Sequence, residues 1–343
     1  MINVLVVDDS AVVRRILSQE LSAAGDIRVV ATAPDPFVAR DKIIEYRPDV
    51  MTLDVEMPRM DGITFLRKVM RYHPLPTIIV SSLTEHGSAM ALEALSAGAI
   101  DVIAKPDSAH TLGDIADQII DRVRAASIAG FEKMTALRKR LDSSPVDSCA
   151  LAKTTNRIIA VGASTGGTVA IEYLLRQMPP GAPGIAVVQH MPEKFTRAFA
   201  ERLDNICEIE VREAADGDSL APGLALIAPG NFHMLVTRSG AHYCVRLKDG
   251  PPVYHQRPSV EVLFNSAARY AGANAVGVLL TGMGADGAAG LLAMKQAGAR
   301  TIAQDEKTCV VFGMPGEAVK LGAAEYVLPI DTIAGKALEL SQE

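Results

Sequence analysis

The chain has 343 residues, of which 49% are hydrophobic and 22% charged, and its net charge is -6. This length exceeds what one hydrophobic core usually supports, so two domains are expected. The ordinary composition excludes a disordered or fibrous protein, and the acidic balance argues against nucleic acid as a partner.

Residues 2–106 alternate short runs of Val, Ile and Leu with segments of helical periodicity. The alternation predicts five strands separated by four helices, with a fifth amphipathic helix at 111–128. We expect a flavodoxin-like α/β domain with a five-stranded parallel sheet, and assign it to residues 1–124. Residues 125–153 lose the apolar period, gather Arg and Lys, and end in Ser, Pro, Asp and Thr, so a linker that begins as a helix is expected there.

A second α/β pattern occupies residues 154–343 and opens as a strand, a glycine-rich turn and a helix. Further strands are expected within IAVVQ, EIEV, LALIA, MLVT, YCVRL, AVGVLL, TIAQ and EYVL, and helices near 194–203, 259–270, 286–297 and 331–341. The pattern predicts a three-layer α/β/α domain with a mainly parallel sheet.

Polar side chains stand at the ends of four expected strands in the first domain. Asp8 and Asp9 follow the first strand, Asp54 ends the third, Ser81 the fourth and Lys105 the fifth. Because the carboxyl ends of parallel strands meet at one edge of a sheet, these side chains should converge. Three carboxylates repel one another, which favours a bound hard cation such as Mg2+. A carboxylate beside Mg2+ can accept a phosphoryl group, with an ammonium neutralising charge and a hydroxyl binding a phosphoryl oxygen.

These residues resemble the receiver domains of two-component response regulators. The resemblance rests on VLVVDDS, LDVEMPRMDG, VSS and AKP, which occur in the expected order on the expected strands. It implies that Asp54 is phosphorylated, and that Asp9 and Asp54 bind Mg2+ directly while Asp8 assists. It also implies that Glu56 contributes its backbone carbonyl to the metal. Ser81 stands where many receivers have Thr, which keeps the hydroxyl.

In the second domain, Gly162, Ser164 and Gly166 fit G-x-S-x-G between a strand and a helix. This spacing is typical of a nucleophile elbow, in which small neighbours permit a sharp turn. The alternative is a glycine-rich turn that binds phosphate at a helix N-terminus. Neither the G-K-[ST] ending of one phosphate motif nor the G-x-G-x-x-G spacing of the other is present.

A serine hydroxyl needs a base to remove its proton, and four histidines are candidates. His190 ends the next expected strand after the Ser164 segment, which places it at the same edge of the sheet. His233 also follows a strand, whereas His242 and His255 lie in polar, turn-like contexts and are weaker candidates. A single histidine at a strand end is more often structural than catalytic, so the alternative stays open for each.

Asp286 is the candidate for the acid that orients the histidine. It follows the apolar run AVGVLL through TGMGA and begins an expected helix, so an N-terminal helix cap is its alternative role. The same loop offers backbone N–H groups near a helix start, which suits an oxyanion hole. The chain order Ser, His, Asp differs from the Ser, Asp, His order of α/β-hydrolases, and predicts a different sheet topology.

The whole chain resembles the chemotaxis protein-glutamate methylesterases, the CheB family, in which a receiver precedes an esterase domain. The matching strings are VGASTGG, VVQHMP, APGNFHM, RPSVEVLF, LLTGMGADGAAGL and TIAQDEKTCVVFGMPGEAV. The resemblance implies Ser164 as nucleophile, His190 as general base and acid, Asp286 as the orienting acid, and the Met283 N–H in the oxyanion hole. Glu261 stands where Asp would be expected, which should alter a local hydrogen bond and leave the triad untouched.

The family implies phosphorylation-activated hydrolysis of glutamate γ-methyl esters on chemoreceptors, the methyl-accepting chemotaxis proteins, for adaptation in bacterial chemotaxis. It also implies deamidation of receptor glutamines, a chemotaxis histidine kinase as phosphoryl donor, and no cofactor in the esterase domain. The alternatives are a phosphorylation-regulated binding module with an inactive output domain, and a serine esterase that acts on another protein substrate.

The cellular compartment is predicted from the cysteines and from the apolar runs. The four cysteines lie far apart without metal-ligand spacing, which fits a reducing cytoplasm better than a disulfide-bonded protein. No apolar run reaches the roughly 18 residues that a membrane-spanning helix needs, and acids follow the first short run directly. We therefore expect a cytoplasmic protein without a signal peptide or membrane insertion.

Overall fold

The computed structural model describes residues 1–57, 60–105, 112–129, 131–143 and 157–343. The chain divides into two compact units, Met1–Phe131 and Glu132–Glu343. Helix α6 (Phe131–Ser143) falls in the segment expected to begin as a helical linker, and residues 144–153 of that segment lie outside the described residues.

The first unit contains a five-stranded parallel sheet in the order β2-β1-β3-β4-β5. Its strands are β1 (Ile2–Val7), β2 (Ile27–Ala33), β3 (Val50–Asp54), β4 (Thr77–Ser81) and β5 (Asp101–Ala104). The central strands β3 and β4 are buried along their whole length, as continuous apolar runs covered on both faces should be. This sheet is the predicted receiver architecture.

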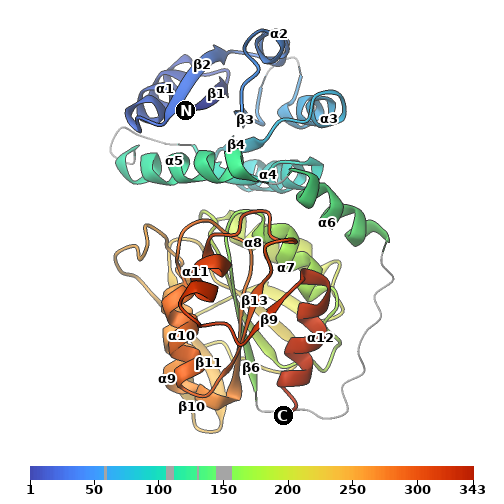
Figure 1. Ribbon diagram of the computed structural model, residues 1–343, viewed down its shortest axis with the longest axis vertical. Helices are drawn as coiled ribbons and strands as arrows, with labels where there is room; N and C mark the ends of the chain where they lie inside the picture. The colour runs from blue at the N-terminus through green and yellow to red at the C-terminus, as the bar shows by residue number, and fades with distance from the viewer. Residues whose placement is uncertain (58–59, 106–111, 130, 144–156) are drawn as a thin grey trace. The chain divides into compact units, whose positions relative to one another are not determined.

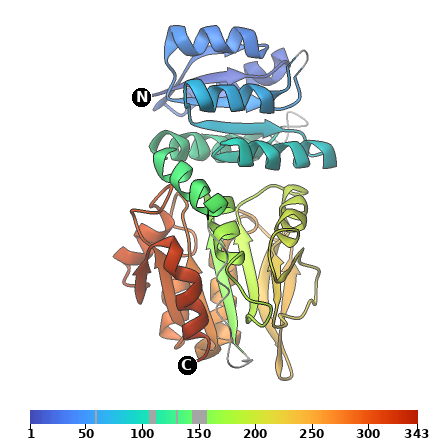
Figure 2. The same ribbon diagram turned by 90° about the vertical axis from the view of Figure 1, so that its right-hand side faces the viewer.

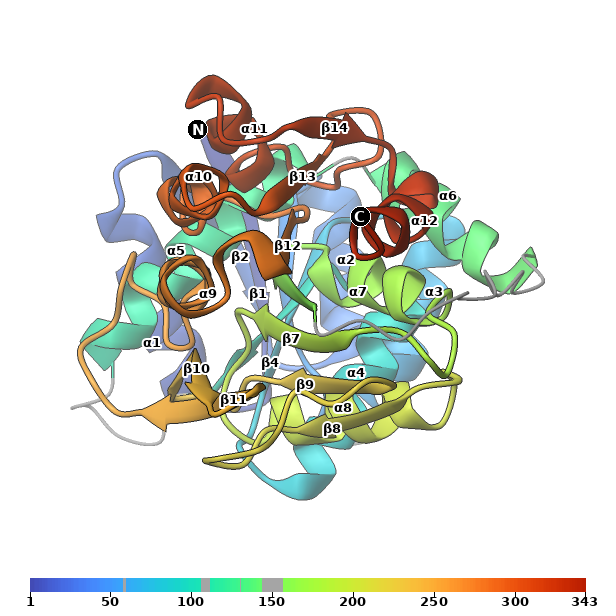
Figure 3. The same cartoon turned by 90° about the horizontal axis from the view of Figure 1, so that it is seen from below.

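Five helices cover the two faces of this sheet. They are α1 (Ala11–Ala23), α2 (Pro36–Tyr46), α3 (Gly62–Tyr72), α4 (Glu85–Ala97) and α5 (Leu112–Ile128). Helix α1 packs beside α5 and α3 beside α4, and Figure 3 shows α1 and α5 on the opposite face from α2, α3 and α4. Side-chain caps mark four of the helix starts, at Ser10, Asp35, Asp61 and Thr84.

The second unit contains a seven-stranded parallel sheet in the order β14-β13-β12-β6-β7-β9-β8. Its strands are β6 (Ile158–Ala163), β7 (Gly184–Gln189), β8 (Glu210–Glu213), β9 (Leu224–Ile227), β12 (Ala275–Leu279), β13 (Arg300–Gln304) and β14 (Tyr326–Leu328). The central strand β6 pairs with β12 on one side and β7 on the other, so the loops after these three strands emerge side by side.

Helices cover both faces of the second sheet (Figure 1). They are α7 (Gly167–Leu175), α8 (Phe195–Asp204), α9 (Val260–Tyr270), α10 (Ala288–Gln296), α11 (Met314–Lys320) and α12 (Ile330–Leu340). Helices α9 and α10 lie on one face, and α12 lies over the other, beside the C-terminus (Figures 1 and 2). The predicted three-layer α/β/α fold is confirmed.

The structure adds two features to the predicted second domain. Strands β10 (His233–Ser239) and β11 (His242–Lys248) form an antiparallel hairpin of their own, outside the main sheet, and β10 packs against α9. Helix α11 was not expected, because MPGEAVK is short and carries a proline and a glycine. Within the described residues, no helix has the length and apolar character needed to cross a lipid bilayer.

Candidate functional site

The carboxylates of the first unit converge as expected. Asp8 follows β1, Asp54 is the last residue of β3, and ligand oxygens of Asp8, Asp9 and Asp54 all lie within 4.8 Å of one another. Lys105, which follows β5, places its Nζ 2.7 Å from Asp54 Oδ2 and 3.2 Å from Asp8 Oδ2. Three carboxylates at this spacing are the donor set that suits a hard cation such as Mg2+.

Burial dominates the electrostatics of this cluster. It raises the pKa of Asp54 to about 6, although hydrogen bonds from Lys105 and the Glu56 N–H act in the opposite direction. Burial also raises the pKa of Asp8, against the opposing charge of Lys105. For Lys105, burial alone would lower the pKa, but the hydrogen bonds and charges of Asp54 and Asp8 together outweigh it and the pKa is raised. A divalent cation would favour the ionised carboxylates, so the residues present fit the metal.

Two further residues of the expected phosphorylation site make contacts of their own. The buried Ser81 hydroxyl donates to the Gly87 carbonyl at 3.1 Å. The Glu56 N–H donates to Asp54 Oδ1 at 3.0 Å, while the Glu56 carboxylate accepts a hydrogen bond from Ser82 at 2.9 Å. The Glu56 side chain is therefore engaged with Ser82, while the metal role that the receiver resemblance implies falls to its backbone carbonyl.

In the second unit, Ser164 and His190 follow neighbouring strands. Ser164 comes directly after β6 and His190 directly after β7, and the preceding residues Ala163 and Gln189 are paired across the sheet. The His190 N–H donates to the Ala163 carbonyl at 3.2 Å, and Gln189 Nε2 donates to the Ser164 carbonyl at 3.0 Å. Ser164 and His190 are both buried. Parallel pairing thus brings the two candidates to adjacent positions on one edge.

The turn at Ser164 requires small neighbours. Gly166 has a φ of +77°, in the left-handed region, and precedes α7 without a side-chain cap. A Cβ on Gly162 would lie 2.1 Å from Cγ1 of Val260, so β6 and the start of α9 approach too closely for any side chain there. These two glycines give the strand-turn-helix geometry of a nucleophile elbow.

The Asp286 carboxylate contacts His190. Its Oδ2 lies 2.7 Å from His190 Nε2 and accepts a second hydrogen bond from the Val260 N–H at 2.8 Å. Its Oδ1 accepts from the Ser259 hydroxyl at 2.8 Å and from the Glu261 N–H at 2.9 Å. Both oxygens are therefore fully occupied, and the carboxylate is locked in one orientation against the imidazole.

The alternative role of Asp286, as cap of the helix that follows it, is not what the structure shows. Helix α10 begins after Gly287 without a side-chain cap, and Asp286 instead caps α9. Burial alone would raise the pKa of Asp286, but the hydrogen bond and charge of His190 and the hydrogen bonds at the α9 start outweigh it and lower the pKa. An ionised Asp286 is an acceptor, so His190 Nε2 is the donor in this contact.

The other candidate histidines lie in different surroundings. His233 begins β10, is buried, and places Nε2 3.0 Å from the Pro251 carbonyl. His242 is exposed at the start of β11, and His255 is exposed in a turn with a φ of +59°. Of the four, His190 is the one in contact with Asp286.

The Met283 amide lies in a loop that approaches Ser164. A Cβ on the neighbouring Gly282 would be 2.7 Å from Ser164 Cβ. The Gly282 N–H donates to the Val311 carbonyl at 3.1 Å, whereas the Met283 N–H has no acceptor within the described part of the chain. A backbone donor without an acceptor, in a loop that packs against the candidate nucleophile, is the kind of group that an oxyanion hole uses.

Several functional contacts lie outside what the sequence predicted. Gln189, Ser259 and Thr281 are buried polar residues whose side chains bond the loops around Ser164 and Asp286. Their only sequence signal is a polar residue directly beside a predicted one or directly after an apolar run. The Glu261 carboxylate accepts a hydrogen bond from the Gly290 N–H at 2.9 Å, and the Glu261 N–H donates to Asp286.

Comparisons with known proteins agree with this geometry. Residues 159–337 match the CheB methylesterase family, and residues 4–117 match the response regulator receiver domain. A protein-glutamate methylesterase/protein-glutamine glutaminase of Syntrophus aciditrophicus is 59% identical, over 99% of each chain. One from Anaeromyxobacter dehalogenans is also 59% identical, over 100% of this chain and 96% of its own.

Among solved structures, the CheB methylesterase catalytic domain of Thermotoga maritima is similar, with a TM-score of 0.52 and 39% identity. The match covers 54% of this chain and 98% of the Thermotoga domain. The family match spans the unit that carries Ser164, His190 and Asp286, and the receiver match spans the carboxylate cluster. The chain belongs to the CheB methylesterase family and carries a response regulator receiver domain ahead of its esterase domain.

Proposed function

We propose that this chain is a phosphorylation-activated protein-glutamate methylesterase that hydrolyses glutamate γ-methyl esters on chemoreceptors. The contact between Asp286 and His190 at 2.7 Å, beside the glycine-bounded turn of Ser164, is the observation that carries the proposal. The close relatives are named as glutaminases as well, and the same machinery would deamidate receptor glutamines.

In the acylation step, His190 Nδ1 takes the proton of the Ser164 hydroxyl, and the oxygen attacks the ester carbonyl. The Met283 N–H faces the oxygen on which negative charge develops. The tetrahedral intermediate then collapses, the C–O bond to the methoxy group breaks, and the imidazolium gives its proton to the departing methanol. Asp286 stabilises the imidazolium throughout, because its ionised carboxylate stays hydrogen-bonded to Nε2.

In the deacylation step, His190 takes a proton from water, and the resulting hydroxide attacks the acyl-enzyme. The bond to Ser164 breaks, the imidazolium gives its proton to the serine oxygen, and the products are a receptor glutamate and the free serine hydroxyl. With a glutamine substrate, the leaving group is ammonia instead of methanol, and the remaining steps are the same. Each hydrolysed site therefore gains one carboxylate on the receptor.

The receiver would control this activity through Asp54. We assign Asp54 as the acceptor of a phosphoryl group from a chemotaxis histidine kinase, with Lys105 and Ser81 as the groups that bind its oxygens. Asp8, Asp9, Asp54 and the Glu56 carbonyl would hold Mg2+, which neutralises charge on the transferring phosphoryl group. The cytoplasm is the compartment in which such a kinase and the cytoplasmic parts of receptors would meet the enzyme.

Mass spectrometry of a methylated chemoreceptor tests this function. With the wild-type chain we expect a loss of about 14 mass units per methylated site, and with Ser164→Ala no loss, because acyl transfer needs the hydroxyl. A receptor that keeps its methyl esters, while the same enzyme hydrolyses esters of another protein, would contradict the proposal that chemoreceptors are the substrate. Demethylation by Ser164→Ala at the wild-type rate would contradict the assignment of Ser164 as the nucleophile.

A further inference from the structure

The buried hydroxyl of Thr281 links three loops at the carboxyl ends of the strands in the second unit, where Ser164 lies. Thr281 lies just after β12 and is fully buried. Its Oγ1 is 3.0 Å from the Thr165 carbonyl and 3.2 Å from the Val311 carbonyl, and it accepts the Val311 N–H at 3.0 Å. The hydroxyl thus bonds the loop after β6 and the loop after β13 at once.

The backbone of Thr281 bonds the same loops. Its carbonyl accepts the Ser164 N–H at 3.0 Å, and its N–H donates to Gln304 Oε1 at 2.9 Å. Thr281 therefore holds the nucleophile turn on both sides of the reacting hydroxyl, at Ser164 through the backbone and at Thr165 through the side chain.

The same residue lies two positions before Met283, whose N–H is the proposed oxyanion donor. Between them, the Gly282 N–H donates to the Val311 carbonyl at 3.1 Å, and the Gly282 carbonyl accepts the Gly313 N–H at 3.0 Å. Val311 is held by the Thr281 hydroxyl and in turn holds Gly282. The positions of the nucleophile and of the oxyanion donor therefore both depend on this hydroxyl.

We infer that Thr281 is a positioning residue of the esterase reaction, whose buried hydroxyl keeps the Ser164 turn aligned with the Met283 amide. The inference rests on the proposed roles of Ser164 and Met283. Thr281 contacts no reacting atom and acts through the loops that carry them. Because a displacement of about 1 Å between reacting groups can cost on the order of 100-fold in rate, the alignment matters for the chemical step.

Substitution by valine removes the hydroxyl and keeps the branched shape. In Thr281→Val, the Val311 N–H loses its partner inside a buried site and the Thr165 carbonyl loses its hydrogen bond from this hydroxyl, so the loops must shift. We expect kcat to fall about 10- to 100-fold while KM stays within about twofold, because the lost alignment affects attack and not substrate binding. Thr281→Ser keeps the hydroxyl and should retain kcat within about threefold.

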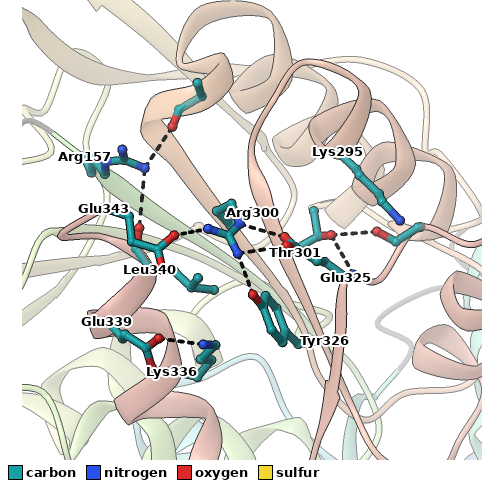
Figure 4. A network of polar contacts seen from close by, with 12 residues as sticks. Arg157, Lys295, Arg300, Thr301, Glu325, Tyr326, Lys336, Glu339, Leu340 and Glu343 are labelled. Carbon is teal, nitrogen blue, oxygen red and sulfur yellow. Dashed lines mark hydrogen bonds and ion pairs between the residues drawn. The ribbon is translucent and has the colours of Figure 1, made fainter.

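Thr301 offers a matched control on the neighbouring strand. It is fully buried, its hydroxyl donates to the Ala323 carbonyl at 2.7 Å, and it accepts the Glu325 N–H at 3.0 Å. Figure 4 shows this hydroxyl in the polar network around Arg300 and Glu325, near the start of β13 and so at the opposite edge of the sheet from Ser164. Thr301→Val loses the same two kinds of hydrogen bond and should keep kcat within about twofold.

The decisive readout is the rate at which a fluorophosphonate labels Ser164 in each full-length variant, measured beside kcat for receptor demethylation. The labelling rate depends on the nucleophile and the oxyanion donor, and not on the receptor. We expect Thr281→Val to label about 10- to 100-fold more slowly than Thr301→Val at equal folded fraction, with Thr281→Ser close to wild type. Equal labelling rates in Thr281→Val and Thr301→Val would overturn the inference.

The design separates this inference from the proposed function. If the fluorophosphonate labels Ser164 of the wild-type chain but the receptor stays methylated, the proposed substrate is wrong. The comparison of labelling rates still decides the role of Thr281. If Thr281→Val does not fold, Thr281→Ala takes its place with the same expectation, since it also lacks the hydroxyl.

Discussion

The Asp286 carboxylate combines two roles at one position. It accepts hydrogen bonds from the Ser259 hydroxyl and from two N–H groups at the start of α9, and it also contacts His190. The N-terminus of a helix favours negative charge, so the same contacts that orient the carboxylate also keep it ionised. The Asp286 carboxylate is therefore fixed by a helix from another part of the chain, and not by its own loop alone.

Replacing Asp286 by asparagine removes the negative charge of the side chain and keeps its size, so it tests how much of the rate depends on the charge. An amide keeps the size of the side chain but cannot stabilise the imidazolium, and it can favour the wrong tautomer of His190. We expect kcat for demethylation to fall about 1000-fold with a small change in KM. Ser259→Ala, which removes one hydrogen bond and no charge, should cost far less. Equal losses in the two variants would contradict the assignment of Asp286.

The pH dependence of stability tests the same carboxylate. Burial opposes ionisation of Asp286, but His190 and the α9 amides lower its pKa below the ordinary value of 3.8. A group whose pKa is lower in the folded state contributes stability above its unfolded pKa and loses it as the pH falls. The wild-type advantage over Asp286→Asn in urea unfolding should thus be constant near pH 6 and shrink below pH 4. An advantage that grows on acidification would contradict the lowered pKa.

The positions of the charged and nucleophilic residues could be predicted from the sequence, because these residues follow expected strands. Ser164, His190 and Asp286 each follow a buried strand, and parallel strands bring such residues to one edge. Thr281 and Gln189 were not singled out, because their importance lies in hydrogen bonds to carbonyls of distant loops. A single sequence without contacts carries no sign of which buried hydroxyl or amide bonds which loop.

At the scale of elements, the site depends on close packing between β6 and α9. A Cβ on Gly162 would lie 2.1 Å from Val260 Cγ1, and Val260 is the first residue of α9. The same end of α9 binds the Asp286 carboxylate, so a shift of the helix moves this carboxylate as well. Gly162 therefore affects the position of Asp286, through α9, as well as the turn at Ser164.

Gly162→Ala should destabilise the fold by about 1–3 kcal/mol, because overpacking forces the strand and the helix apart. Adding Val260→Ala should recover part of this loss, and the double-mutant cycle in urea unfolding measures the coupling. Additive effects of the two substitutions would contradict the packing argument. Gly335→Ala is the control: Gly335 lies in α12 with open space where a Cβ would be, so this change should stabilise by about 0.5–1 kcal/mol.

The periodicity of the sequence predicted both parallel sheets, because continuous apolar runs mark strands buried on both faces. Helix α10 begins at Ala288, two residues after the predicted start, since Asp286 is used by α9. Helix α11 was not predicted, because the proline and glycine in its short sequence indicate a loop. Strands β10 and β11 were predicted, but their separation from the main sheet is a tertiary feature that local periodicity does not encode.

At the scale of the whole molecule, one chain joins a receiver to an esterase. The carboxylate cluster of the receiver and the contact between Asp286 and His190 lie in different compact units. In the proposed function, phosphorylation of Asp54 in the first unit controls the esterase activity of the second.

Phosphorylation should raise methanol release in the wild-type chain and not in Asp54→Asn. With acetyl phosphate and Mg2+, we expect a several-fold rise in rate that chelation of the metal abolishes, because the acyl phosphate forms on the metal-bound carboxylate. Asp61→Asn is a matched control, since Asp61 is a receiver acid that caps α3 and lies outside the carboxylate cluster. A phosphodonor response that survives in Asp54→Asn would contradict the assigned site.

The covalent intermediate offers the most direct test of the esterase chemistry. A methylated receptor peptide is mixed with the full-length enzyme, the reaction is quenched in acid within the first turnover, and the enzyme is digested and mapped by mass spectrometry. The account predicts an adduct of the peptide mass minus methanol on the fragment that contains Ser164. Methanol release without any such adduct, or an adduct on another residue, would contradict it.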